Sequence, residues 1–249
     1  MATRIALLGD IHGNEVALEA ALAAIAKKKP DVIAVTGDLA LNGPRPGAVI
    51  RMLRALESSA GAVVIQGNTD IAVADMDYAA AFPWFDEVPA AQRAAAEWTH
   101  DSLSDDELDW LRRLPSERRL TLGDHMVLIC HASPGSQTAG LAADLDPSVT
   151  VDRVTRTDAR VIACGHTHVA EIRELGAKLI CNPGSCGYAF DGDPSAAWAM
   201  LTLDDDGGPV AELFRTIYDA VAVADEVSSR GLPGDVYRAA TIRTGRFVR

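Results

Sequence analysis

The sequence has 249 residues, of which 48% are hydrophobic and 23% are charged, a balance typical of a globular protein with a substantial core. The formal net charge of −12 disfavours binding to long nucleic acids and to anionic membranes. No apolar run approaches the roughly 20 residues that a membrane span needs, so we expect no membrane partner. We expect residues 1–249 to form a single domain.

The compartment is inferred from the cysteines and from the first residues of the sequence. We expect no secretory signal ahead of the first predicted strand at residues 5–8. None of the four cysteines has CxxC spacing; they are Cys130, Cys164, Cys181 and Cys186. Reduced cysteines in a cytoplasmic protein are therefore expected. The sequence indicates no oligomeric state.

The first part of the chain alternates buried strands with helices. Apolar runs at 5–8, 32–36 and 62–65 predict strands, and helical spacing predicts helices at 15–28 and 47–57. The strands end on the pairs Gly9-Asp10, Gly37-Asp38 and Gly67-Asn68. Such units predict an α/β fold with a mostly parallel sheet, whose ligands bind beyond the carboxyl ends of the strands.

The pattern changes between residues 71 and 119. An irregular aromatic stretch around Pro83 precedes two predicted helices at 90–103 and 105–114, and Ser104 is a suitable N-cap for the second. We therefore expect a helical flap at about residues 75–118. Two roles remain open for it: packing onto the sheet, or capping the active-site mouth in contact with the leaving group.

The second half of the chain is rich in short strands joined by turns. Consecutive hairpins there predict antiparallel additions to a second sheet, and hence two mixed β-sheets packed as a sandwich and flanked by helices. A short helix is expected at 147–157, and a C-terminal helix at 220–229 ends before Gly231. The expected strands are 119–122, 126–130, 160–164, 172–175, 179–181, 197–203 and 210–218, with the last hairpin turning across 204–209.

Seven potential metal ligands follow predicted strands. They are Asp10, His12, Asp38, Asn68, His131, His166 and His168. Asp10 and His12 are two residues apart, and in an extended backbone such side chains point the same way. A mixture of imidazole, carboxylate and amide ligands suits Mn²⁺, Fe, Zn²⁺ or Ni²⁺ rather than Mg²⁺ or Ca²⁺. With one carboxylate shared, seven side chains are enough for two metals.

These residues lie in five ordered motifs. The motifs are GDIHGN at 9–14, GD at 37–38, GNTD at 67–70, CHASP at 130–134 and GHTH at 165–168. Their order resembles the calcineurin-like metallophosphoesterase superfamily. NGP at 42–44 and NPGS at 182–185 resemble its compact prokaryotic branch, which groups phosphodiesterases with diadenosine-tetraphosphatase-like proteins. The resemblance implies a metallophosphoesterase-like αββα fold.

The resemblance also implies a role for each ligand. Asp10, His12 and His168 would hold one divalent transition metal, and Asn68, His131 and His166 would hold a second. Asp38 would bridge the two, so that Asp38 and Asn68 belong to the catalytic centre. Mn²⁺ is our first expectation for both metals. The implied reaction is hydrolysis of a small phosphorylated substrate, a phosphodiester in first place, by in-line attack of a metal-bridging hydroxide.

One position departs from the family motif. Thr69 stands where the family has a histidine that protonates the leaving group, and a hydroxyl cannot replace that acid near neutral pH. Asp70 would then have a reduced catalytic role or only brace its loop. Thr69 and Asn14 are candidate substrate-binding residues, and N-capping of the first helix is the alternative role for Asn14.

Two other functions remain alternatives. The first is a metal-binding interaction scaffold of the same fold without significant turnover, although such a protein should show eroded ligands and all seven are intact. The second is a nuclease acting on DNA ends, which requires a basic groove that the net charge disfavours. The family acts on nucleotides, dinucleoside polyphosphates, phosphoproteins and DNA, and nothing in this sequence selects among them.

Overall fold

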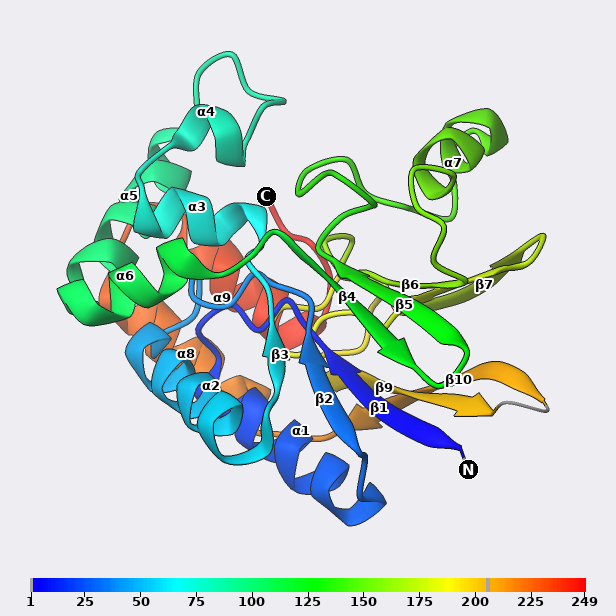
Figure 1. Cartoon of the computed structure of the whole chain (residues 1–249). Helices are drawn as coiled ribbons and strands as arrows, with labels where there is room; N and C mark the ends of the chain where they lie inside the picture. Colours follow the sequence, from blue (N-terminus) through cyan, green and yellow to red (C-terminus); the bar gives the residue numbers. More distant parts are fainter. Residues whose placement is uncertain (1, 205–206) are drawn as a thin grey trace.

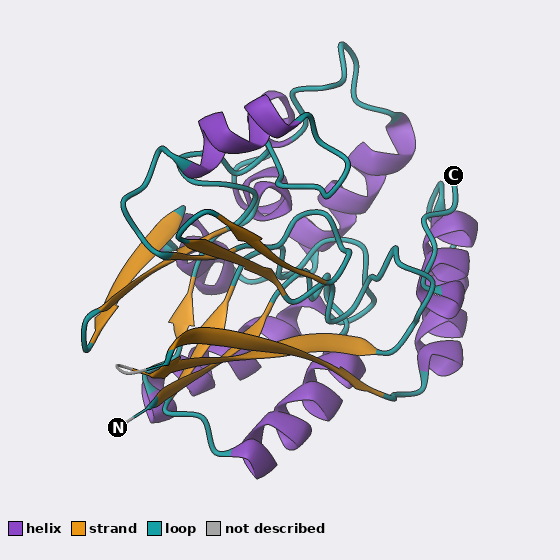
Figure 2. Ribbon diagram, turned by 90° about the vertical axis from the view of Figure 1, so that its right-hand side faces the viewer, coloured by secondary structure: helices purple, strands orange, loops and turns teal. Residues whose placement is uncertain are grey.

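Two five-stranded sheets pack face to face in the computed structural model, which describes residues 2–204 and 207–249 (Figures 1 and 2). In order, the first sheet contains β10 (Gly208–Thr216), β9 (Ala196–Asp204), β1 (Thr3–Leu8), β2 (Val32–Val35) and β3 (Val63–Val64). The second contains β4 (Glu117–Leu122), β5 (His125–Cys130), β6 (Val161–Ala163), β8 (Lys178–Asn182) and β7 (Glu171–Leu175). The predicted pair of mixed sheets is confirmed.

Each sheet has a parallel centre with antiparallel additions. β1, β2 and β3 are parallel, and β9 and β10 join β1 as an antiparallel hairpin. In the second sheet β5, β6 and β8 are parallel, while β4 and β7 pair antiparallel at the edges. Positions 205 and 206 of the predicted last turn lie outside the described residues.

The central strands are buried on both faces. Ile5 and Leu7 of β1 point into the core between the sheets, whereas Ala6 and Leu8 face helices α1 (Glu15–Lys28) and α2 (Pro46–Ala60). The same alternation occurs in β5, whose outer face packs against α7 (Pro147–Val154). Burial on both faces explains why these strands are continuous apolar runs in the sequence.

In the sequence, four helices follow β3 of the first sheet and precede β4 of the second. They are α3 (Asn68–Ala74), α4 (Tyr78–Ala81), α5 (Ala90–Asp101) and α6 (Asp105–Arg113). The predicted capping box of α6 is present, with Ser104 and Glu107 bonded reciprocally. α3 and α4 were not predicted, because helices of seven and four residues are too short to show a helical period.

The C-terminal part contains two helices where the sequence predicted one. α8 (Ala220–Arg230) ends at Gly231, as the sequence predicted, and the helix that was not predicted, α9 (Asp235–Thr244), packs back against it. The reason is a buried ion-pair network: Asp235 accepts hydrogen bonds from Arg230 and Arg238 and so folds α9 back onto α8. The Arg230 guanidinium also lies over the ring of Trp98 in α5, 4.5 Å from the ring centroid.

The described residues include no helix that is both long enough and apolar enough to cross a membrane.

All four cysteines are free and buried, as the sequence predicted for Cys130 and Cys164. Cys130 lies in the core outside the second sheet, and burial raises the pKa of its thiol well above the ordinary value. Cys130→Ala should lower the free energy of unfolding by about 1–3 kcal/mol, because it removes a packed core atom. Denaturant unfolding measures this change. A variant as stable as the parent would contradict the placement of Cys130 in the core.

Candidate metal centre

The loops that follow five strands converge at one edge of the sandwich. Asp10 and His12 follow β1, Asp38 follows β2, and Asn68 begins α3 shortly after β3. His131 follows β5, and His166 and His168 follow β6. The carboxyl ends of parallel strands from both sheets therefore supply all seven predicted ligands to one site.

Asp10, His12 and His168 form a first group together with Asp38. The Nε2 atom of His12 lies 3.1 Å from Nε2 of His168 and 3.5 Å from Oδ2 of Asp38. Nε2 of His168 lies 3.5 Å from Oδ1 of Asp10. One ligand atom from each of the four buried residues lies within 4.8 Å of the others, so this group is a possible metal site.

Asn68, His131 and His166 form a second group around the other oxygen of Asp38. Nε2 of His131 lies 3.4 Å from Oδ1 of Asp38 and 3.0 Å from Oδ1 of Asn68. Nδ1 of His166 lies 3.1 Å from Oδ1 of Asn68 and 3.2 Å from Nε2 of His131. The second group thus brings two imidazole nitrogens and one amide oxygen together.

Each of the four imidazoles is oriented by the backbone. The pairs are His12 Nδ1 with the Leu41 carbonyl, His131 Nδ1 with the Thr36 carbonyl, His168 Nδ1 with the Tyr188 carbonyl, and His166 with the backbone of Thr138. A carbonyl only accepts hydrogen bonds, so the bonded ring nitrogen carries the proton. The other nitrogen then presents its lone pair to the centre, which is the usual arrangement of a metal-binding histidine.

The Asn68 amide is oriented in the same way. Its Nδ2 donates to the carbonyl of Ala81 at 2.9 Å, so Oδ1 is the atom that faces His131 and His166. An amide oxygen is the ligand atom that asparagine offers to a cation. Gly67, the preceding residue, must be glycine, because a Cβ there would lie 2.1 Å from Oδ1 of Asp38.

Most of the ligand residues have left-handed backbone. Positive φ angles occur at Asp10 (49°), His12 (51°), Asp38 (56°), His166 (70°) and His168 (58°). The expectation that an extended backbone aligns Asp10 with His12 was therefore wrong, although the two side chains do converge. Left-handed backbone is uncommon outside glycine and clusters at functional sites, where surrounding structure compensates for its cost.

The two carboxylates of the centre respond differently to their surroundings. Burial, reinforced by the charge of Asp38, raises the pKa of Asp10 well above its ordinary value. Burial also raises the pKa of Asp38, but neighbouring imidazoles outweigh it and lower that pKa to about 2. These imidazoles belong to His131, His12 and His166. A pair of buried carboxylates this close together calls for a compensating positive charge.

Burial also keeps three of the imidazoles neutral. It lowers the pKa of His12 and that of His168, and together with the charge of His131 it lowers the pKa of His166 to about 4. These three imidazoles are unprotonated at neutral pH, which is the form that binds metal ions. Ring orientation, neutral imidazoles and buried carboxylates together fit a divalent cation.

The remaining predicted residues have structural contacts. Asn14 accepts from the N–H of Ala17 and donates to Gly187 O and Tyr218 Oη, so its amide caps α1, one of its two expected roles. Asp70 accepts from the backbone N–H groups of Gly67 and Leu39 and so braces the loop. Burial, and then the charge of Asp38, raise the pKa of Asp70 to about 7.

Thr69 is buried beside Asp38, at the edge of the predicted metal centre. Its N–H donates to Oδ1 of Asp38 at 3.0 Å, and its side chain lines the cavity described below. Its hydroxyl is buried and has no hydrogen-bond partner among the described residues. A hydroxyl in this position has a free donor and a free acceptor for a group bound at the centre.

A cavity of about 390 Å³ opens onto the centre. His12, Asp38, Asn68, His166 and His168 are exposed to it. Its walls come from distant parts of the chain: Trp84 and Phe85 of the predicted flap on one hand, and Tyr237 and Phe247 of the C-terminal part on the other. Phe82 is 3% exposed and packs in the core, so the aromatic stretch at 82–85 both packs onto the protein and lines the cavity.

Part of this cavity is lined by residues that the sequence did not single out. Tyr237 and Arg238 lie on the unpredicted helix α9, and Tyr188 and Phe190 follow the NPGS motif. The available signal was the helical spacing of apolar residues after Pro233. Asn42 was noted only as part of the NGP motif, yet it lines the cavity with a left-handed φ of 83° and is held by the guanidinium of Arg238.

Comparisons with known proteins agree with this arrangement. Residues 3–206 match the calcineurin-like phosphoesterase superfamily domain. An uncharacterized protein of Methanocaldococcus jannaschii is 24% identical in an alignment of 244 positions that covers 92% of this chain and 93% of that relative.

Solved structures have the same fold over nearly the whole chain. A hypothetical protein from Pyrococcus horikoshii OT3 superposes with a TM-score of 0.83 and 20% identity, covering 98% of each chain. A metallophosphoesterase from Sphaerobacter thermophilus superposes with a TM-score of 0.75 and 25% identity, covering 98% of this chain and 100% of that one.

Metal binding should change the stability of the protein. At a metal concentration one hundred times Kd, the free energy of unfolding should rise by about 2.7 kcal/mol over the chelator-treated protein. Asp10→Asn should lose this gain without destabilising the metal-free protein, because it removes a buried charge that only a cation compensates. Denaturant unfolding with and without Mn²⁺ measures both effects.

The matched control is His100→Ala, since the His100 side chain bonds to Val73 O and does not line the cavity. This variant should keep the full metal-dependent gain. Equal gains in Asp10→Asn and the parent protein would show that the cation binds elsewhere.

Proposed function

The chain belongs to the calcineurin-like phosphoesterase superfamily, and on this premise we propose that it is a binuclear-metal phosphoesterase that favours phosphodiesters. The observation that carries the proposal is the position of Asp38. Its two oxygens face different ligand groups, Oδ2 towards His12 and Oδ1 towards His131. A carboxylate in this position can bridge two cations about 3.5–4 Å apart.

In this proposal the seven side chains divide into two ligand sets that share Asp38. Asp10, His12 and His168 hold one metal, and Asn68, His131 and His166 hold the other. Mn²⁺ is the first candidate for both sites, and Fe, Zn²⁺ and Ni²⁺ suit the same ligands. When bound, such a pair supplies a water nucleophile that is ionised near neutral pH and neutralises charge on the phosphoryl oxygens.

The protein itself fixes the geometry of the reaction. Backbone carbonyls hold the imidazoles in one tautomer, so the ligands need no reorganisation when substrate binds. The Thr69 hydroxyl, which has no partner among the described residues, is placed to bond a phosphoryl oxygen in the cavity. Asp70 supports this loop through Gly67 and Leu39.

Among the described residues that line the cavity, every histidine is a predicted metal ligand, so none is left to protonate the leaving group. Thr69 occupies the position of the family's histidine, and the His100 ring donates to Val73 O outside the cavity. The leaving oxygen would therefore depart as an anion or take a proton from solvent. This deficit favours aryl esters and phosphoanhydrides over simple alkyl esters.

Asp38→Asn tests the bridge. It keeps the shape of the side chain but removes the charge shared by two cations, so it should abolish turnover and weaken both metals. Asn68→Ala should mainly weaken one metal. Elemental analysis after Mn²⁺ saturation should give two equivalents in the parent protein and about one in Asn68→Ala. A fully active parent protein with one equivalent, or equal mild effects from both substitutions, would reject the binuclear assignment.

Thr69→His tests the missing acid. General acid catalysis contributes about 10²–10⁴-fold, so kcat/KM of the parent protein should fall steeply as the pKa of the leaving group rises. Thr69→His should make that dependence shallower if Asp70 orients the new ring. The measurement is kcat/KM across aryl and alkyl phosphodiesters of graded leaving-group pKa. A shallow dependence in the parent protein would mean that another residue acts as the acid.

A metal-supplemented screen of phosphomonoesters, phosphodiesters, cyclic nucleotides and dinucleoside polyphosphates distinguishes the enzyme from the scaffold alternative. The enzyme should turn over at least one of these classes in a metal-dependent manner. Full metal occupancy without turnover of any class would favour a metal-binding scaffold.

A further inference from the structure

We propose that the cavity contains an aromatic subsite and that the substrate carries a nucleobase-sized flat ring next to its scissile phosphate. The inference rests on the proposed function, because the phosphate is expected at the ligands described above. It goes further because it names a narrower class of substrate, nucleotide-like phosphoesters, whereas the metal ligands alone would accept many phosphoesters.

The first wall of the subsite consists of Trp84 and Phe82, and Trp84 lies next to the predicted ligand His166. The Trp84 ring lies 6.2 Å from the His166 ring and 5.9 Å from the Phe82 ring, centroid to centroid, with Trp84 and Phe82 in a T-shaped arrangement. Phe82 is 3% exposed and anchored in the core, whereas Trp84 is 52% exposed. The indole is thus held by a buried neighbour and retains a large surface that a ligand can cover.

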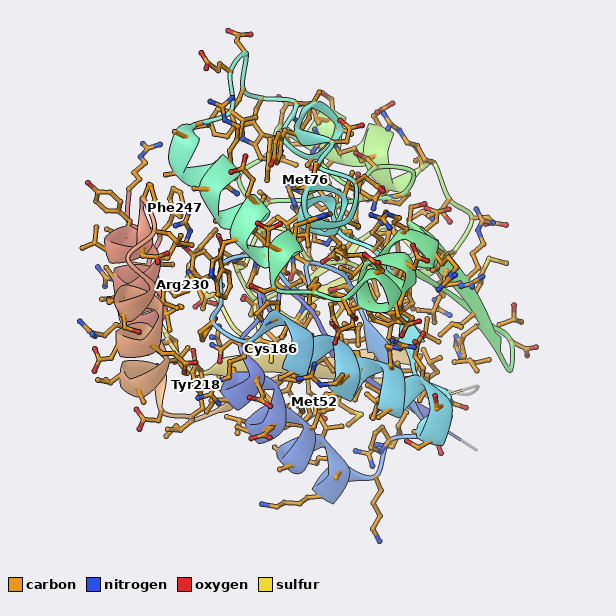
Figure 3. All side chains as sticks on the ribbon, turned by 90° about the vertical axis from the view of Figure 1, so that its left-hand side faces the viewer. Met52, Met76, Cys186, Tyr218, Arg230 and Phe247 are labelled. Carbon is orange, nitrogen blue, oxygen red and sulfur yellow. The ribbon has the colours of Figure 1, made fainter. Side chains whose placement is uncertain are left out.

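The second wall consists of Phe190 and Phe247, and Phe190 lies next to His168 of the other predicted ligand group. Phe190 stacks on the His168 ring at 4.1 Å with an interplanar angle of 17°, and Phe247 packs on Phe190 at 5.0 Å. Phe247 is 57% exposed and lies beside the α8–α9 pair (Figure 3). Tyr237 of α9 lines the same side of the cavity.

Two aromatic series therefore extend outward, one from a ligand in each group, and both line the same cavity. Exposed aromatic rings gathered around a pocket indicate a binding surface, because leaving them in water has a cost that a bound apolar group removes. Flat heterocycles stack on aromatic side chains without regard to base identity. A volume of about 390 Å³ lies within the range of pockets that hold one small ligand.

The second wall is held firmly in place. Arg238 of α9 donates to Asn42 Oδ1 and Asp235 Oδ1, and Arg230 donates to the carbonyls of Asn42 and Gly43. These bonds fix the C-terminal helices to the loop beyond β2, close to His12. The aromatic rings of the C-terminal part are therefore set in position before a ligand enters, which reduces the entropy lost on binding.

The test compares adenosine 5′-monophosphate with ribose 5-phosphate, which share the sugar phosphate and differ only in adenine. Calorimetric titration of the Mn²⁺-loaded protein gives both Kd values, and the ligands recovered afterwards are checked for intact ester bonds. Stacking of one base changes affinity by about fivefold or more, so the nucleotide should bind at least about tenfold more tightly to two aromatic walls.

Substitutions in each wall test whether the aromatic rings cause the difference between the two Kd values. Trp84→Ala and Phe247→Ala should each reduce the ratio of the two Kd values to about threefold or less, while the Kd of ribose 5-phosphate changes by less than about twofold. Ile217→Ala is the control, since Ile217 is 89% exposed and does not line the cavity. It should leave both affinities unchanged.

Equal affinities of the parent protein for the two ligands would overturn the inference, and so would an equal loss of both affinities in Trp84→Ala. Hydrolysis of bis(p-nitrophenyl) phosphate is measured on the same samples. Turnover without base discrimination rejects the aromatic subsite alone. Base discrimination without turnover of any phosphoester supports the subsite and rejects the proposed catalytic function.

Discussion

The centre of this protein is organised by the burial of two close carboxylates, Asp10 and Asp38, among four imidazoles. Burial of ionised groups is costly unless an opposite charge compensates them, and the ring nitrogens that face the carboxylates carry lone pairs. A bound cation would compensate the buried negative charge and would also accept the lone pairs of the ring nitrogens. The strand ends, the glycines that let loops approach and the carbonyls that fix each ring are consistent with one requirement, the binding of divalent metal.

The sequence was sufficient to predict that these seven side chains meet, because each follows an apolar run that indicates a buried strand. Parallel strands bring their carboxyl ends together, so residues as distant as Asp10 and His168 could be assigned to one site. The local geometry was not predictable in the same way. The left-handed backbone at Asp10 and His12 depends on hydrogen bonds to the loop after β2, which no local pattern reveals.

The cavity walls were the least predictable part. Tyr237 and Phe247 reach the centre only because a buried network of Arg230, Asp235 and Arg238 folds α9 back against α8 and the loop at Asn42. Such a network is a tertiary interaction between charged side chains, which the sequence suggests would be solvated. The convergence of the predicted ligands thus follows from strand order, whereas the cavity walls depend on contacts that only the folded chain creates.

The left-handed backbone at five ligand positions also limits how this protein can evolve. Aspartate, asparagine, histidine and glycine tolerate that conformation better than other residues, so exchange among them spares the loops. A lineage that lost metal binding would therefore keep its scaffold most readily by drifting to asparagine or glycine at Asp10, Asp38 or His166. Replacement by valine or isoleucine would strain the backbone as well as remove a ligand, and selection for folding should remove such variants.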